Sequence, residues 1–298
     1  MNAQCEAVLN SRAIADTVRR ALAEDAPWGD ITSESLIPAD ARLSAKLVAR
    51  EPGVLSGVDV FTAAMTLTDS STEVQPLLPD GSRFERGTVL ATVAGAARSV
   101  LTAERVALNF VQRMSGIATM TAQFVAAVAG TKVRIVDTRN TTPGLRLFER
   151  HSVRCGGGHN HRFSLSDAVL AKDNHLAVLT RNGERDLTEA LREVRRRLPH
   201  TTHLEVEVDR PEQIAAVLDA GVDTILLDNF SLDQMRAAVG QIAGRALVEA
   251  SGSVKLDGVR AIAETGVDII SIGALTHSAR ALDLGLDAVV ETIGGAPR

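Results

Sequence analysis

Cationic side chains are concentrated between Asp137 and His175, and few acids lie among them. This stretch begins at the end of one apolar run and closes at the end of another. The downstream ends of buried strands are where α/β folds place ligand sites. An anionic ligand with several carboxylates or phosphates is therefore predicted. The cations are Arg139, Arg146, Arg150, Arg154, Arg162 and Lys172, with His151, His159, His161 and His175 between them.

These cations fall into two groups. Arg146, Arg150 and Arg154 are spaced by four, as on one face of a helix, and we interpret them as solvated surface residues. Arg139, Arg162 and Lys172 each lie beside a predicted strand end or a glycine loop, and for them we favour ligand binding. Lys172 could alternatively form a Schiff base. The neighbouring arginines and carboxylates favour a charge-neutralising ammonium instead.

Carboxylates also gather at predicted strand ends. Glu205, Glu207 and Asp209 alternate along one strand and so share a face, and Asp228 closes the run TILLDN. Two carboxylates at adjacent strand ends suit Mg²⁺, which binds one or two carboxylates together with substrate phosphates. The alternative, which we weigh equally, is that each acid pairs with Lys172 or an arginine.

Small residues follow the last two predicted strands, in Glu249–Ser253 and Ile272–Ser278. Such residues let backbone N–H groups approach a phosphate, assisted by hydroxyl groups and the following helix. The final two loops of (β/α) barrels are frequent phosphate sites. The two loops together therefore predict phosphate binding.

The elements that must position these residues follow a regular alternation after residue 130. Apolar runs at 132–136, 168–171, 204–208, 224–227, 246–249 and 268–272 are typical of buried parallel strands, with helices such as 187–198 and 211–220 between them. The segment AGVD before ILLDN is echoed 45 residues later by TGVD before IISIG. Repeated units of this kind predict a parallel sheet, open or closed, and we favour a barrel with a central site.

The preceding part of the chain indicates a small α+β domain. We expect helices at 11–24 and 58–67, short strands between 43 and 93, and a long helical stretch at 101–128 that breaks near Ser115-Gly116. Trp28 is expected to be a packed anchor. The predicted domains are 1–115 and 116–279, with 280–298 returning to the first domain as a helix plus tail.

Composition excludes several classes of protein. A chain of 298 residues with 45% hydrophobic and 23% charged residues is typical of a globular protein, and its net charge of −5 argues against a nucleic-acid partner. Two cysteines, Cys5 and Cys155, provide no disulfide framework and favour a reducing cytoplasm. Neither a membrane span nor a secretory signal pattern is evident.

Nine sequence pieces, taken together, resemble one enzyme family. They are EDAPWGDITS, ERVALNFVQRMSGIAT, DTR-TTPGLR, RCGGGHNHR, KDNH, EVEVD, LLDN, EASGS and SIGALTHS, spread over nearly the whole chain. In this order they closely resemble the quinolinate phosphoribosyltransferases (nicotinate-nucleotide diphosphorylase, carboxylating). The resemblance implies an N-terminal α/β sandwich domain and an open (β/α) barrel of about six parallel strands. It also implies a homodimer in which Arg105 enters the partner's active site.

The implied reaction joins quinolinate to phosphoribosyl pyrophosphate with Mg²⁺ and yields nicotinate mononucleotide, pyrophosphate and CO₂. The resemblance implies catalytic roles for Lys172, Glu207 and Asp228, the last two holding Mg²⁺ directly or through water. The implied substrate-binding residues are Arg105, Arg139, Asn140, Thr141, His161, Arg162, Lys172, Ser251, Gly252, Ser253, Gly273, Ala274, Leu275 and Thr276.

Two positions depart from the family pattern. Asn140 stands where the family has lysine, and an amide supplies donors without charge. Ser253 replaces a common glycine, and we expect this replacement to be neutral. Asn140 leaves two alternatives open: a paralogous phosphoribosyltransferase for another heteroaryl carboxylate, or a phosphoribosyl-binding protein that has lost turnover.

Overall fold

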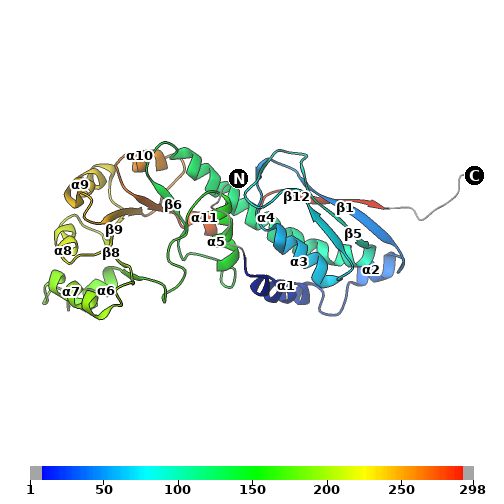
Figure 1. Ribbon diagram of the computed structural model, residues 1–298, viewed down its shortest axis with the longest axis horizontal. Coiled ribbons are helices and arrows are strands. Elements are labelled where there is room, and N and C mark those ends of the chain that lie inside the picture. Colours follow the sequence, from blue (N-terminus) through cyan, green and yellow to red (C-terminus); the bar gives the residue numbers. More distant parts are fainter. Residues whose placement is uncertain (1–8, 291–298) are drawn as a thin grey trace, which may run out of the picture. The chain divides into compact units, whose positions relative to one another are not determined.

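The structure is a computed structural model that describes residues 9–290 and divides into two compact units (Figure 1). The first unit contains residues up to Ala122, Pro143–Gly157 and the chain from Ala279 onward. The second contains Gln123–Thr142 and Gly158–Ser278. The boundary predicted at residue 115 falls inside helix α4 (Ala97–Ala127). Residues 143–157 belong to the first unit, although the sequence pattern had placed them in the barrel.

The first unit is built on an antiparallel sheet with the strand order β12-β1-β5-β3. These strands are β1 (Arg42–Ala49), β3 (Glu73–Pro76), β5 (Val89–Ala96) and β12 (Leu284–Val290), while β2 (Gly53–Val54) pairs separately with β4 (Arg83–Phe84). The described part of the C-terminal segment therefore returns to the first unit as a strand, not as the predicted helix. Leu284 and Leu286, two residues apart, both pack against the core, which is the period of a strand. Residues 291–298 lie outside the described range.

The described residues of the first unit also form five helices: α1 (Ser11–Asp25), α2 (Ile31–Leu36), α3 (Val58–Thr68), most of α4, and α5 (Arg146–Cys155). The predicted break near Gly116 is absent, since α4 runs on through that residue. A Cβ atom at Gly116 would lie 1.9 Å from the carbonyl oxygen of Arg280. This glycine therefore permits a close chain crossing, and it does not end the helix.

Trp28 is 92% exposed, so the prediction that it is a packed anchor is wrong. It lies in the turn between α1 and α2, which Asp30 organises by accepting a hydrogen bond from Ser33 N (3.0 Å). Because that cap fixes the turn, the indole is not needed to hold it. Ile31 and Leu36 on α2 are 76% and 73% exposed, so this end of the unit displays an apolar surface.

The second unit contains a six-stranded parallel sheet that is open, with β6 and β7 at its edges. The order is β6-β11-β10-β9-β8-β7, and all six predicted strands are confirmed. Their bounds are β6 (Arg134–Val136), β7 (Val169–Ala171), β8 (Leu204–Val208), β9 (Thr224–Asp228), β10 (Leu247–Ser251) and β11 (Ile269–Ser271). All carboxyl ends in a parallel sheet meet at one edge, which is where the predicted site residues of this unit lie.

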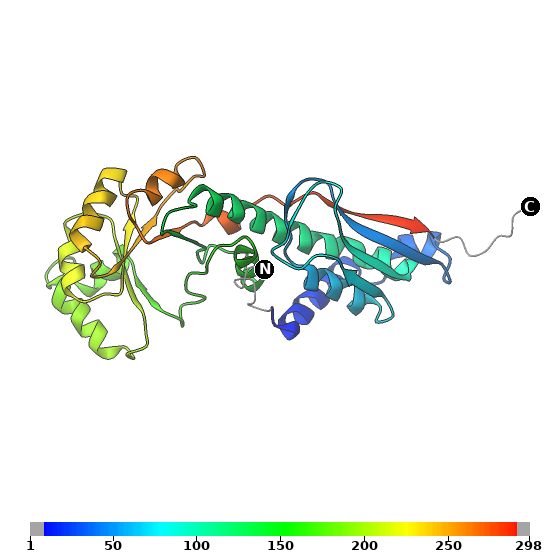
Figure 2. The same cartoon turned by 45° about the horizontal axis from the view of Figure 1, so that its top comes forward.

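Short helices connect these strands, and α7, α8 and α9 lie along one side of the sheet (Figures 1 and 2). The helices are α6 (Asp173–Leu179), α7 (Leu187–Arg197), α8 (Gln213–Asp219), α9 (Leu232–Ile242), α10 (Val259–Ala263) and α11 (Ala274–His277). Within the described residues, no helix combines the length and hydrophobicity needed to cross a bilayer.

The echoed segments have the same structural role in two successive units. Gly221 and Gly266 follow helices with positive φ (75° and 94°), a backbone conformation that glycine adopts without strain. Asp223 then accepts a hydrogen bond from Leu204 N (2.7 Å) on the neighbouring strand, and Asp268 accepts one from Val248 N (2.9 Å). Each aspartate thereby ties the start of its own strand to the adjacent strand.

Candidate active site

One cavity lies at the carboxyl edge of the parallel sheet, entirely within the second unit. His159 forms a parallel bridge with Val136, which brings the following His161 and Arg162 beside the end of β6. The residues that line the cavity are Thr138, Arg139, Asn140, His161, Arg162, Leu170, Lys172, Glu207, Leu226, Glu249, Ser251 and Ser271.

The cavity collects seven of the predicted site residues: Arg139, Asn140, His161, Arg162, Lys172, Glu207 and Ser251. The others fall outside its lining. Asp228 ends β9, Thr141 follows Asn140, and Gly252 and Ser253 lie in the loop after β10. Gly273 is the N-cap of α11, and Ala274, Leu275 and Thr276 lie in that helix, which follows β11. Arg105 is an exposed residue of α4 in the first unit.

Arg139 and Arg162 place two guanidinium groups against the same cavity. Burial, together with the like charge of Arg139, holds the pKa of Arg162 below its usual value. Arg139 Nε is buried and has no hydrogen-bond partner among the described residues. Burying such a donor unpaired is costly, and two cations are held together here at an electrostatic cost. An anion in the cavity would relieve both costs.

His161 lies between two buried carboxylates. Its Nε2 is 3.1 Å from Glu205 Oε2 and 3.5 Å from Glu249 Oε2. Burial opposes a charge on the ring, but the hydrogen bonds to Glu205 and Glu249 and their negative charges prevail and raise the pKa of His161 to about 10. The imidazolium is therefore the form present at neutral pH.

The backbone around His161 is held by Asp137, which is completely buried. Asp137 Oδ1 accepts a hydrogen bond from His161 N (2.8 Å), and its Oδ2 accepts one from Asn160 Nδ2 (2.5 Å). Arg162 N in turn donates to His161 Nδ1 (2.8 Å). Only an unprotonated Nδ1 can accept that bond, so formation of the imidazolium gives it up, whereas the proton on Nε2 faces the two glutamates in either form.

Glu249 was not predicted as a site residue, and Glu205 was predicted only as an alternative to Glu207 for the acid that lies over the site. The alternation of side chains along β8 predicts that Glu205 and Glu207 lie on the same face of the strand. The sequence alone does not show which of the two lines the cavity. Glu249 is distant in sequence and appeared only as the residue before Ala250-Ser251. Both side chains are almost fully buried, and within the described chain their Oε1 atoms have no hydrogen-bond partner.

Lys172 Nζ and Glu207 Oε2 are 2.7 Å apart and form an ion pair at the carboxyl ends of β7 and β8. Asp228, at the end of the adjacent strand β9, accepts a hydrogen bond from Asn229 Nδ2 (3.0 Å). Two carboxylates on neighbouring strands are a donor set that suits Mg²⁺. The fit is conditional, because a metal contact at Glu207 Oε2 requires the Lys172 ammonium to move away.

The loop after β10 depends on glycine at position 252. Gly252 has φ 101°, and a Cβ atom there would lie 2.1 Å from Asn229 Oδ1. Ser253 has φ 40°, which is left-handed backbone that favours glycine. The expectation that serine is neutral at position 253 therefore needs correction, because its backbone is strained.

Asn140 lies against the loop after β11. A Cβ atom at Gly273 would be 3.1 Å from Asn140 Nδ2, and Thr276 Oγ1 donates to Asn140 O (2.7 Å). The position at which the sequence departs from the family pattern is therefore next to a loop with predicted phosphate-binding residues. Thr276 is fully buried and serves here to fix the backbone of residue 140.

The arginines of α5 are not simply a solvated helix face. Arg150 is only 9% exposed, and Arg146 and Arg154 are partly buried. Glu149, on the same helix, is buried and paired with Arg113 of α4. The interpretation of these residues as surface cations is therefore wrong for Arg150, because α5 is packed into the first unit.

Comparisons with known proteins agree with one another. The model for the quinolinate phosphoribosyl transferase N-terminal domain matches residues 30–115, and that for its C-terminal domain matches residues 117–287. A relative from Mycobacterium leprae, nicotinate-nucleotide pyrophosphorylase [carboxylating], is 47% identical over 280 residues, which cover 91% of this chain and 96% of that protein. A Bacillus subtilis protein, probable nicotinate-nucleotide pyrophosphorylase [carboxylating], is 38% identical and covers 90% of each chain.

Solved structures extend the match to the fold. The crystal structure of NadC from Streptococcus pyogenes superposes with a TM-score of 0.91 at 39% identity, covering 96% of this chain and 100% of that one. The nicotinate-nucleotide pyrophosphorylase from Ehrlichia chaffeensis gives a TM-score of 0.86 at 37% identity, covering 92% and 98%. The open parallel sheet with its small antiparallel partner unit is the architecture that these proteins share. The chain therefore belongs to the quinolinate phosphoribosyl transferase family.

Proposed function

We propose that this protein transfers the phosphoribosyl group of phosphoribosyl pyrophosphate to quinolinate and releases CO₂, giving nicotinate mononucleotide and pyrophosphate for NAD biosynthesis. One observation carries the proposal: Arg139, His161, Arg162 and Lys172 line a single cavity. Quinolinate carries two carboxylates on adjacent ring carbons. Their charge matches a cavity with several fixed cations, and arginine can bind a carboxylate through two parallel hydrogen bonds.

The chemistry needs the charges that these residues supply. The ring nitrogen of quinolinate forms a bond to C1′ of the sugar as the bond from C1′ to pyrophosphate breaks. The 2-carboxylate then leaves as CO₂, and its electron pair stays on the ring beside the cationic nitrogen until a proton replaces it. Fixed cations that hold the dicarboxylate stabilise the charge that develops on the ring. The cationic His161 contributes to this field at neutral pH.

The charge of the pyrophosphate group favours binding of a divalent cation, and we propose that this cation is Mg²⁺. Glu207 and Asp228 would hold it, directly or through water, with Mg²⁺ neutralising the charge of the leaving group. Lys172 would then exchange Glu207 for a substrate carboxylate. The loops Ser251–Ser253 and Gly273–Thr276, together with Asn140 and Thr141, would surround the phosphates.

We further propose a homodimer in the cytoplasm. The exposure of Trp28, Ile31 and Leu36 supports it, because apolar side chains this exposed gather at surfaces that meet a partner. Arg105, exposed on α4, would complete the substrate site of the partner subunit. Sedimentation of the purified protein tests the assembly. Mixing an Arg105→Ala variant with a variant defective at Lys172 tests the shared site, because a hybrid dimer would recover one intact site.

The direct assay supplies quinolinate labelled in its 2-carboxylate, phosphoribosyl pyrophosphate and Mg²⁺. We expect nicotinate mononucleotide and labelled CO₂ in equal amounts, and no product when nicotinate replaces quinolinate. Turnover of nicotinate alone would identify the protein as a phosphoribosyltransferase for another carboxylate. Tight binding of phosphoribosyl pyrophosphate without release of label would identify a binding protein.

A further inference from the structure

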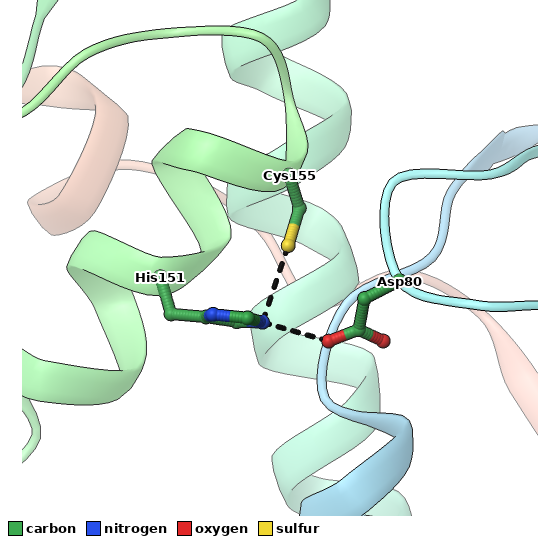
Figure 3. Close-up of side chains that lie close together, drawn as sticks. All are labelled: Asp80, His151 and Cys155. Atoms are coloured by element: carbon green, nitrogen blue, oxygen red, sulfur yellow. Dashed lines mark hydrogen bonds and ion pairs between the residues drawn. The ribbon is translucent and has the colours of Figure 1, made fainter. Parts of the chain in front are cut away.

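A second cluster of chemically reactive side chains lies in the first unit (Figure 3). It consists of Asp80, His151 and Cys155, and it shares no residue with the cavity described above. His151 Nε2 lies 2.7 Å from Asp80 Oδ2 and 3.2 Å from Cys155 Sγ. All three side chains are largely shielded from solvent. The proposed reaction uses none of them.

Local structure fixes the cluster from two sides. His151 and Cys155 are four residues apart on α5, so both side chains project from the same face of the helix. Asp80, in the turn before β4, accepts hydrogen bonds from Gly57 N (2.8 Å) and Val58 N (3.0 Å) at the start of α3. The carboxylate is therefore held in place by backbone groups that are independent of α5.

The packing of the next residue, Gly156, fixes the end of α5. A Cβ atom at Gly156 would lie 2.4 Å from Ala118 O, so α5 and α4 approach each other closely there. Cys155 itself packs with Ala118 and Ala122 of α4. The sulfur therefore has little freedom to leave the position in which it faces His151.

The geometry excludes a nucleophilic triad. In such a triad the acid contacts one ring nitrogen and the nucleophile contacts the other, whereas Asp80 and Cys155 both approach Nε2. One ring nitrogen carries at most one proton, which can be donated well to only one of the two groups. A metal ion bound to the neutral Nε2 could instead contact the carboxylate oxygen and the thiolate together.

We propose that Asp80, His151 and Cys155 form a binding site for Zn²⁺. Nitrogen, thiolate and carboxylate are the three donor types that zinc binds in proteins. One donor atom from each residue lies within 4.8 Å of the other two, which is compatible with a shared ion after small side-chain adjustments. Three protein donors with water as the fourth ligand complete the tetrahedral coordination that zinc prefers.

The charges of the ligands themselves and the end of α5 also favour a cation. Thiolate and carboxylate together supply two negative charges, which balance a divalent ion. Cys155 is the last residue of α5, where the carbonyl ends of the helix favour positive charge. The hydrogen bonds from Gly57 N and Val58 N orient the Asp80 carboxylate, as hydrogen bonds to the ligands do in metal sites.

The absorption spectrum of the Co²⁺-loaded protein tests the proposal, because a thiolate bound to Co²⁺ absorbs by charge transfer in the near ultraviolet. We expect one equivalent of Co²⁺ to produce this band in the metal-free, reduced protein, and one equivalent of Zn²⁺ to remove it. Carboxylate sites such as that at Glu207 and Asp228 contain no sulfur and give no such band. Absence of the band from the unmodified protein overturns the proposal without any variant.

Two cysteine variants provide a matched comparison. Cys155→Ser should abolish the band and weaken Zn²⁺ binding at least tenfold, whereas Cys5→Ser should leave both unchanged. Loss of the band in Cys5→Ser, or its survival in Cys155→Ser, overturns the assignment. His151→Gln and Asp80→Asn should each weaken Zn²⁺ binding while circular dichroism confirms that the variants fold. If both bind zinc as tightly as the parent, the cluster is a structural hydrogen-bond network only.

Heating experiments provide a second readout. An ion that binds only the folded state of a protein raises the melting temperature of that protein. Zn²⁺ should therefore raise the melting temperature of the parent protein and of Cys5→Ser, but not that of Cys155→Ser. An equal rise in all three proteins would locate the bound zinc elsewhere and overturn the proposal.

Discussion

Lys172 Nζ lies 2.7 Å from Glu207 Oε2, so a residue expected to bind substrate is paired with one expected to bind metal. Lys172 is half exposed, whereas the Glu207 side chain is 13% exposed. The exposed Lys172 ammonium can exchange Glu207 for other partners at little cost. The two residues can therefore stabilise each other before the substrates arrive and separate when the substrates bind.

Changing Glu207→Gln removes the carboxylate but keeps the shape of the side chain. We expect the Mg²⁺ concentration for half-maximal activity to rise about tenfold, since one charged ligand becomes a neutral one, about 1.4 kcal/mol. Initial rates measured over a range of Mg²⁺ concentrations provide the check. Asp209→Asn, an exposed position just beyond β8, serves as the control and should change little. An unchanged Mg²⁺ requirement in Glu207→Gln would leave Glu207 as a partner of Lys172 only.

Changing Lys172→Met removes the ammonium group. A charge-assisted hydrogen bond contributes about 1.5–3 kcal/mol, so kcat/KM for quinolinate should fall by roughly ten- to a hundredfold or more. Steady-state kinetics with quinolinate as the varied substrate measure the loss. Lys132→Met is the matched control, because Lys132 forms a surface pair with Asp268 away from the cavity lining. Equal effects in the two variants would contradict a substrate contact at Lys172.

Changing Asn140→Lys restores the charge that the family pattern has at this position. We expect kcat/KM to rise about fivefold, corresponding to about 1 kcal/mol for a contact that becomes charge-assisted. Varying quinolinate and phosphoribosyl pyrophosphate separately shows which substrate the new ammonium meets. The change is structurally feasible because Asn140 is exposed. A decrease in kcat/KM for both substrates would mean that the amide is adapted to this chain.

The protonation of His161 should differ from that of an ordinary histidine. With its pKa raised to about 10, the ring should show no titration between pH 6 and 8 in NMR spectra. Its contribution to stability is fully present below the ordinary value of 6.5 and is lost as pH rises through about 10. Urea unfolding should therefore need less urea at pH 10 than at pH 7.

Replacing Glu205→Gln should move the titration of His161 toward neutral pH, because one of its two carboxylate partners becomes neutral. Glu249 remains and should keep the pKa above the ordinary value. Comparison with His161→Gln identifies the resonance. Titration of the parent ring near pH 6.5 would contradict the cationic state that we assign to the resting site.

Alanine substitutions at two glycines with positive φ distinguish the effect of backbone strain from that of a steric clash. Gly252 (φ 101°) and Gly244 (φ 75°) should both lose about 1–2 kcal/mol of stability on substitution by alanine, because alanine is strained in left-handed backbone. Only at Gly252 would the new methyl group also collide with Asn229, since Gly244 faces open space. We therefore expect Gly252→Ala alone to weaken the binding of phosphoribosyl pyrophosphate, as measured by calorimetry. If Gly252→Ala and Gly244→Ala bind phosphoribosyl pyrophosphate with equal affinity, the loop at Gly252 is not part of the phosphate site.

The sequence by itself determined the six parallel strands, because each is an apolar run followed by a helix with its own periodicity. It also determined that Arg139 and Lys172 follow strand ends and that Arg162 follows the glycine loop, and the carboxyl ends of parallel strands share an edge. Some of the predictions that were wrong concerned single residues. Trp28 was predicted to be packed because it is apolar, and Gly116 was predicted to break a helix because glycine often does.

Only the tertiary structure decided which side chains meet. The pairing of His161 with Glu205 and Glu249 joins residues from three separate segments, and no local pattern encodes such contacts. Gly116 lies in an unbroken helix because a chain segment more than 160 residues later crosses it at Arg280. Arg150 is buried because α5 packs within the first unit. Periodicity reports which face of an element is apolar, whereas the partner of that face depends on how distant elements pack.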